Sequence, residues 1–247
     1  MSNPARQRVL LSLLVLLALL VAGLTPFQGS LSATPGSDET LVLLTTFDTD
    51  QTVPENFAEI GELRTATDDG ASWAVVAGSS GRREGAFLLT TESVDGGPCG
   101  DRTAAFGLRA SFGEGLGEGV LDLSFSIRPK QKNGTVGFTL SGERGVDILG
   151  LKFDGEGRIC VGDSTLLVGY RADKTYVVEA TLAAPHDSVR TYQVTVFDVE
   201  KQAVIGCWTG TVAGGPLLGA RWTKPAGSAG SWWIDEIEAW WLDQSFE

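Results

Sequence analysis

The residues whose types could do chemistry gather near the C-terminal end of the chain, in Ser231 to Leu242. This stretch holds four of the seven tryptophans and the acidic residues Asp235, Glu236 and Glu238. Two carboxylates about 5 Å apart can hydrolyse a glycosidic bond. Carboxylate oxygens also bind calcium, and exposed indole rings stack on sugar faces. The sequence therefore offers three candidate chemistries here.

The spacing of these residues weakens the catalytic alternative. With the period of two that a strand imposes, one face carries Trp233, Asp235, Ile237, Ala239 and Trp241, and the other carries Trp232, Ile234, Glu236, Glu238 and Trp240. Asp235 then points away from both glutamates. His186, the only histidine, stands in a polar turn, and any Ser-His-Asp triad would have to use it. The residues favour a protein without enzymatic activity, and a glycoside hydrolase or polysaccharide lyase remains the alternative.

The tryptophans outnumber what a core of this size needs, so we expect some of them to bind a ligand. The predicted ligand-binding residues are Trp208, Trp222, Trp232 and Trp240. Tryptophan on both faces of the last strand requires at least one face to pack inward. The opposite interpretation, in which the rings form the core and rim of a sandwich, therefore stays open.

Three aspartates predict a structural calcium site. Asp48 and Asp50 follow the first expected strand, and Asp235 lies on the last. If these strands are neighbours, the three carboxylates converge and supply oxygens to an ion that takes 6 to 8 of them. The alternative is that they hydrogen-bond turns at the rim of the sheet.

Short alternating segments separated by glycine-rich turns predict an all-β fold. Strands are expected at 41–47, 71–77, 86–91, 106–112, 121–127, 136–140, 148–153, 157–161, 176–182, 192–196, 203–212 and 231–242. A loop is expected at 113–119. A hairpin is expected at Asp154-Gly155, where both residues can take positive φ. No segment after residue 40 shows sustained helical periodicity.

The order of these segments resembles the concanavalin A-like lectin/glucanase superfamily, which includes laminin-G-like domains. The matching pieces are Leu-Leu-Thr-Thr-Phe-Asp at 43–48, Leu-Asp-Leu-Ser-Phe-Ser-Ile at 121–127, Leu-Gly-Leu-Lys-Phe-Asp-Gly at 149–155 and Trp-Ile-Asp-Glu-Ile at 233–237. The resemblance implies a two-sheet antiparallel jelly-roll sandwich. The laminarinase-like enzymes of this superfamily place three acids on one face, a pattern from which Asp235, Glu236 and Glu238 depart.

An apolar run at 9–24 follows Arg6 and Arg8, as in a secretory signal peptide. We expect a signal peptide or uncleaved anchor helix at 1–32, a linker at 33–40 and the sandwich domain at 41–247. The domain would then be extracytoplasmic, secreted or held by its N-terminal segment. A formal net charge of −12 argues against nucleic acid and anionic membranes as partners.

Three cysteines in an exported chain leave one unpaired, and a Cys160–Cys207 bridge is the first expectation. The alternative is three reduced thiols, with the buried ones acting as small hydrophobic residues. Together these features predict an exported, non-catalytic recognition module for a carbohydrate or a cell-surface partner. A purely structural extracellular domain is a further alternative, favoured if the tryptophans are buried.

Overall fold

The computed structural model describes residues 39–47, 58–67, 72–77, 85–90, 106–143, 146–162, 164, 166–186, 189–225, 228 and 230–243. All of them belong to one compact unit, Ser37–Glu247. The predicted signal segment, Asp48, Asp50 and Cys99 lie outside the described residues. Within the described part of the chain, no helix is long and apolar enough to cross a membrane.

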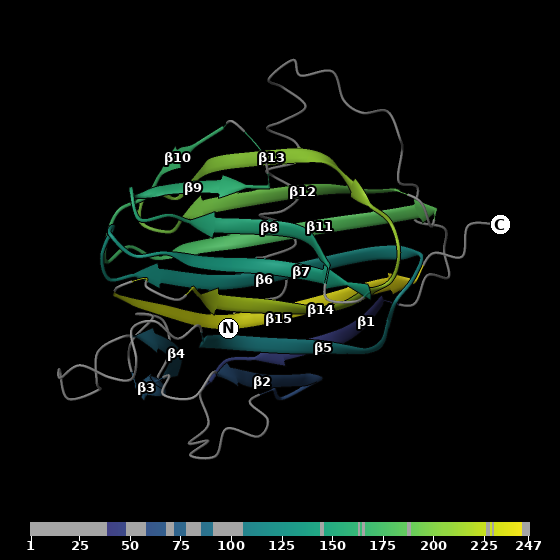
Figure 1. Ribbon diagram of the computed structural model, residues 1–247, viewed down its shortest axis with the longest axis horizontal. Helices are drawn as coiled ribbons and strands as arrows, with labels where there is room; N and C mark the ends of the chain where they lie inside the picture. Colours follow the sequence, from purple (N-terminus) through teal and green to yellow (C-terminus); the bar gives the residue numbers. More distant parts are fainter. Residues whose placement is uncertain are drawn as a thin grey trace, which may run out of the picture. The chain divides into compact units, whose positions relative to one another are not determined.

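The predicted all-β sandwich is confirmed: the described strands form two antiparallel sheets (Figure 1). Sheet A has eight strands in the order β13-β12-β11-β6-β15-β4-β3, with β1 also pairing with β15. Its strands are β1 (Glu39–Thr45), β3 (Ser72–Ala77), β4 (Gly85–Thr90), β6 (Gly119–Pro129), β11 (Tyr176–His186), β12 (Val189–Asp198), β13 (Ala203–Ala213) and β15 (Ser231–Asp243). The first and last strands are neighbours, as expected.

Sheet B has seven strands in the order β10-β9-β8-β7-β14-β5-β2. They are β2 (Glu62–Thr67), β5 (Phe106–Leu116), β7 (Val136–Gly142), β8 (Asp147–Phe153), β9 (Arg158–Val161), β10 (Val168–Gly169) and β14 (Leu217–Lys224). The sequence patterns missed β2, β10 and β14. β10 has only two residues and β2 holds one buried leucine, so neither shows a clear alternation.

The predicted loop at 113–119 was wrong. β5 continues to Leu116 and β6 begins at Gly119, so only two residues connect them. The buried guanidinium of Arg190 donates hydrogen bonds to the carbonyls of Leu116 and Gly117, and to Gly215 on a neighbouring turn. A charged donor therefore satisfies the carbonyls of this turn.

A β-bulge interrupts β15 and changes which of its residues face the core. Asp235 pairs with Ser126 of β6 but Glu238 pairs with Ser124, so two residues of β15 oppose one of β6. Glu236 takes the left-handed conformation with φ of 51°, and its amide donates to Asp235 Oδ1 at 2.8 Å. The period of two therefore restarts after the bulge, and the expected faces are wrong for half of the strand.

The bulge places buried residues on both of the predicted faces. Trp232 and Ile234 are buried before it, and Ile237, Ala239 and Trp241 are buried after it. The partly exposed residues include Trp233, Glu236, Glu238 and Trp240. The outer face of β15 thus carries two tryptophans and two glutamates.

Aromatic rings fill the space between the sheets. Trp222 of sheet B lies edge-on to Phe125 of sheet A, with ring centroids 5.5 Å apart. Trp232 of sheet A lies 6.0 Å from both Phe153 and Tyr170. Such tilted and edge-to-face pairs are favoured over stacked ones and join the two sheets in one core.

We expect Trp232→Ala to lower the free energy of unfolding by about 3–5 kcal/mol, because it opens a large cavity in the core. Trp240→Ala on the outer face of the same strand should cost about 1 kcal/mol or less. Equilibrium urea unfolding measures both. Equal losses would contradict the change of face at the bulge.

The predicted Cys160–Cys207 bridge was wrong, since both thiols are free. Cys160 lies on β9 between the buried Ile159 and Val161, and Cys207 lies on β13 between the buried Gly206 and Trp208. Each thiol therefore points to the outer surface of its own sheet. The two belong to opposite sheets, so the core separates them.

Cys207 should react with iodoacetamide faster than Cys160 in the native protein. Cys207 is exposed, whereas burial raises the pKa of the Cys160 thiol and lowers its thiolate fraction. Mass spectrometry of digested, time-resolved samples gives the two rates. A Cys160–Cys207 linked peptide in a non-reducing digest would contradict this arrangement.

Candidate functional site

The structure does not bring the four predicted ligand-binding tryptophans to one surface. Trp222 and Trp232 have no exposed area, and Trp208 is 3% exposed, with its Nε1 donating to the carbonyl of Leu166. Trp240 alone is partly exposed, and its Nε1 donates to Glu238 Oε1 at 2.7 Å. Three of the four rings therefore serve the packing of the sandwich.

Trp233, which was not among the predicted ligand-binding residues, joins Trp240 on the outer face of β15. Cations lie over its ring, with Arg128 at 5.3 Å and Lys130 at 4.9 Å from the centroid. Both cations are also in reach of Asp173. The Trp233 ring is thus already engaged in a cation–π cluster, which leaves less of it for stacking on a ligand.

Of the three predicted calcium ligands, the structure describes only Asp235. Its carboxylate is 1% exposed, and Oδ1 accepts the hydrogen bond from Glu236 at the bulge. No group of three or more His, Cys, Asp or Glu side chains within the described ranges is arranged to hold a metal ion. In the described part of the chain, the Asp235 carboxylate stabilises the bulged backbone of β15 through this hydrogen bond.

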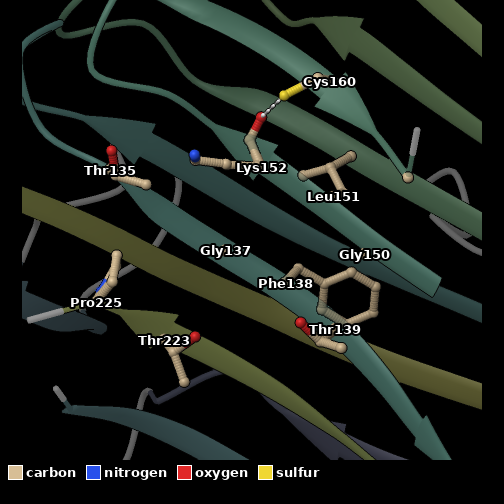
Figure 2. Close-up of a pocket in the computed structure, with 11 residues that line it drawn as sticks. Thr135, Gly137, Phe138, Thr139, Gly150, Leu151, Lys152, Cys160, Thr223 and Pro225 are labelled. Carbon is tan, nitrogen blue, oxygen red and sulfur yellow. Dashed lines mark hydrogen bonds between the residues drawn. The ribbon is translucent and has the colours of Figure 1, made fainter. Parts of the chain in front are cut away.

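An open groove of about 350 Å³ lies on the outer face of sheet B, over the neighbouring strands β14, β7, β8 and β9 (Figure 2). Its strand residues include Gly137, Thr139, Gly150, Lys152, Cys160 and Thr223. All of these are exposed or half-buried, and they alternate with buried residues along their strands. The volume is at the lower end of the range for ligand sites, about 300–1,000 Å³. The groove is a shallow, open concave feature among polar side chains, and we treat it as the candidate site.

Two glycines form the floor of the groove. A Cβ atom at Gly137 would lie 3.8 Å from its nearest neighbour, Thr223 Oγ1, and one at Gly150 would lie 4.0 Å from a backbone oxygen. Neither glycine has positive φ. By contrast, a Cβ at Gly107 of β5 would collide with the backbone of Trp222. The fold needs glycine at 107 but does not need it at 137 or 150.

Hydroxyl groups and one ammonium group surround this floor. Figure 2 shows Thr223 on one side of Gly137 and Lys152 on the other, with Thr139 further along β7. Thr135, at the start of β7, is held by Ser228, whose hydroxyl bonds to both its backbone amide and its carbonyl. The groups lining the floor can donate and accept hydrogen bonds.

Cys160 is a poor nucleophile in this setting. Burial is the main cause of its raised pKa, with a further contribution from the negative charge of Asp154. Its thiol donates to the carbonyl of Lys152 at 3.6 Å, the bond drawn in Figure 2. The described residues that line the groove include no Asp, Glu or His.

Asp154 holds the hairpin that joins β8 to β9 beside the groove. Its Oδ1 accepts the amides of Glu156 and Arg158, and its Oδ2 accepts the guanidinium of Arg158, all at 2.9 Å. The predicted hairpin is confirmed, but the positive φ is at Gly157 rather than at Asp154 or Gly155. Burial acts to raise the pKa of Asp154, and these bonds outweigh it, so the pKa is lowered overall.

Because the folded pKa of Asp154 lies below its ordinary value of 3.8, its charge stabilises the fold at neutral pH. This contribution should be lost as the pH falls through 3.8 and below. Asp154→Asn keeps an acceptor oxygen and removes the charge. We expect the difference in unfolding free energy between wild type and variant to be largest near pH 7 and to shrink in acid, as measured by urea unfolding. A difference that stays constant in acid would contradict this role.

The residues of the groove were missed by the sequence patterns, which concentrated on tryptophan and carboxylates. A signal was present in the glycines of Val136-Gly-Phe-Thr-Leu140 and Leu149-Gly-Leu-Lys-Phe153. Glycine inside a strand often marks a close approach by a ligand or another backbone. The sequence does not show which face of the sheet these glycines occupy or that they lie near each other. Both facts follow only from the pairing of β7 with β8.

The fold is that of the concanavalin A-like jelly-roll proteins. The sequence matches no protein-family model and no curated protein sequence. Among solved structures, the exoplasmic/lumenal domain of VIP36 in its metal-free form aligns at a TM-score of 0.50 and 9% identity, over 84% of this chain and 95% of that one. The likeness identifies the fold alone.

Two further structures align less closely. A PL-14 alginate lyase from Aplysia kurodai gives a TM-score of 0.48 at 10% identity, over 72% of this chain and 89% of the lyase. A sialidase gives 0.47 at 14% identity, and the aligned part of this chain corresponds to only 16% of the sialidase.

Proposed function

We propose that this chain is a non-catalytic recognition module that binds a carbohydrate in the groove on the outer face of sheet B. The observation that carries the proposal is the pair of glycines at 137 and 150. Glycine within a strand destabilises it by roughly 0.5–1 kcal/mol relative to alanine. Neither the backbone conformation nor a close neighbour requires glycine at these two positions. We therefore attribute the absence of side chains to a ligand that lies on the floor of the groove.

The groups around the floor suit a sugar. Thr135, Thr139 and Thr223 offer hydroxyls that donate and accept, and Lys152 donates. A flat floor without side chains lets a pyranose ring approach the sheet. The acid–base pair of a glycosidase would need two carboxylates, and the described lining supplies hydroxyls, an ammonium group and a protonated thiol instead.

The expected location is extracytoplasmic, secreted or anchored through residues 1–32. The basic residues and apolar run at the N-terminus support this proposal. The shared fold with an exoplasmic/lumenal domain is consistent with it. A calcium ion held by Asp48, Asp50 and Asp235 remains part of the proposal, supported by the pairing of Thr45 at the end of β1 with Ile237, two residues from Asp235.

A glycan array probed with the full chain, with and without calcium, tests the function. We expect binding to one class of glycan, and Gly137→Val and Gly150→Val should each weaken it about tenfold or more by filling the floor. Valine suits an outward position in a strand, so the urea midpoint should not fall.

Gly117→Val is the matched control, because a Cβ there has nothing within 4 Å and the residue lies outside the groove. It should bind as the wild type does. Absence of glycan binding in both conditions would overturn the proposal, and release of reducing ends from a polysaccharide would overturn its non-catalytic part.

A further inference from the structure

Three arginines lie in register across the strands beside the groove. Arg64 of β2 pairs with Arg109 of β5, and Arg109 pairs with Arg221 of β14. Arg221 in turn pairs with Thr139 of β7, at the groove. Arg109 and Arg221 each lie between two buried residues, and the exposed Arg64 follows the buried Leu63, so all three side chains point outward from sheet B. The row therefore leads across the sheet into the groove.

This arrangement works against the stability of the sheet. Like charges directly opposite one another on antiparallel strands are destabilising. Glu62 reaches Arg64 at 2.7 Å and Asp147 pairs with Arg221, which relieves the two ends of the row. Arg109, in the middle, forms no ion pair with any other described residue.

The row is also out of keeping with the overall charge of the chain. Acidic residues outnumber basic ones by 31 to 19, so a random surface position is more often negative than positive. Lys152 adds a further exposed cation beyond Gly137, with which it pairs in register. The groove floor thus has Arg221 on one side and Lys152 on the other.

The geometry indicates the kind of anion. Adjacent strands are about 4.8 Å apart, so the row presents cations at short, repeated intervals. A polymer with a repeated anionic group matches this spacing better than a single small anion does. The planar guanidinium binds a carboxylate through two parallel hydrogen bonds.

Nucleic acid fits the same surface less well. Proteins that bind single strands place aromatic rings under the bases. The described residues on the outer face of sheet B are glycine, threonine, serine, aliphatic, thiol and charged side chains, without an exposed aromatic ring.

We propose that the groove and the row Arg64–Arg109–Arg221 together bind an acidic polysaccharide whose repeating unit carries a carboxylate, that is, a polyuronate. This inference rests on the proposed carbohydrate-binding function and names its ligand class. Sugar rings lie on Gly137 and Gly150, and carboxylates of neighbouring residues along the polymer meet the arginines.

The test compares ligands that differ only in charge. Tetragalacturonate and its methyl ester are titrated against the full chain by calorimetry, together with tetramannuronate, a sulfated dextran fragment and single-stranded DNA. We expect at least one uronate to bind and the neutral ester to bind about tenfold or more weakly. Raising the salt concentration should lower the affinity for the uronate and leave the affinity for the ester unchanged.

Two arginine variants test whether uronate binding depends on the arginine row. Arg109→Gln should weaken uronate binding about tenfold or more and leave the weak binding of the ester unaltered. Arg128→Gln, which removes an arginine from the outer face of sheet A, should change neither. The unfolding free energy of Arg109→Gln should match or exceed that of the wild type, because a like-charge contact is removed. Arg128→Gln should lower the unfolding free energy modestly, because its guanidinium lies over the Trp233 ring.

The outcomes separate the two proposals. Equal binding of uronate and ester, or uronate binding unaltered in Arg109→Gln, leaves a glycan-binding groove and overturns the polyuronate inference. Equal binding of uronate, sulfated dextran and DNA would mean that the arginine row attracts anions in general, and it would also overturn the polyuronate inference. Absence of binding to uronates, while neutral glycans bind on the array, overturns the inference alone. Absence of binding to any glycan overturns both.

Discussion

The bulge at Asp235 and Glu236 is the constraint on which the arrangement of sheet A depends. β15 lies at the centre of that sheet, between β6 on one side and β1 and β4 on the other. One extra residue in β15 changes the face of everything that follows it. Without the bulge, Trp232 and Trp241 could not both face the core. The buried Asp235 carboxylate, through its bond to the amide of Glu236, stabilises the turn of the backbone at this point.

The large aromatic rings and the small or charged residues occupy different faces of the two sheets. Most of the large rings lie between the sheets, where Trp222 and Trp232 each contact aromatic partners across the core. The outer face of sheet B instead carries small residues at the groove and cationic side chains beside it. A jelly roll can leave one face this bare because the core on its other face supplies the stability.

The arginines of the row and the glycines of the groove share one property: neither adds to the stability of sheet B. Glycine in a strand adds no packing, and arginines in register repel one another. Natural sequences are mostly consistent with their folds, and departures from that consistency concentrate where function requires them. Both departures meet at Thr139, which lies between Arg221 and Gly150 in the same cross-strand row. This coincidence is why we propose a binding site on sheet B rather than at the tryptophans of β15.

The sequence by itself determined the fold class and most strands, because alternation of buried and exposed residues depends only on the strand period. It also located the hairpin after Asp154. Tertiary structure alone decided the rest. The bulge cannot be read from Ser231 to Leu242, since it arises from pairing with β6, and it separates Trp232 in the core from Trp240 on the outer face. The groove and the arginine row depend on strands far apart in the sequence, β2, β5, β14, β7 and β8, coming into register. Register between distant strands is a property of the assembled sheet, which no local pattern contains.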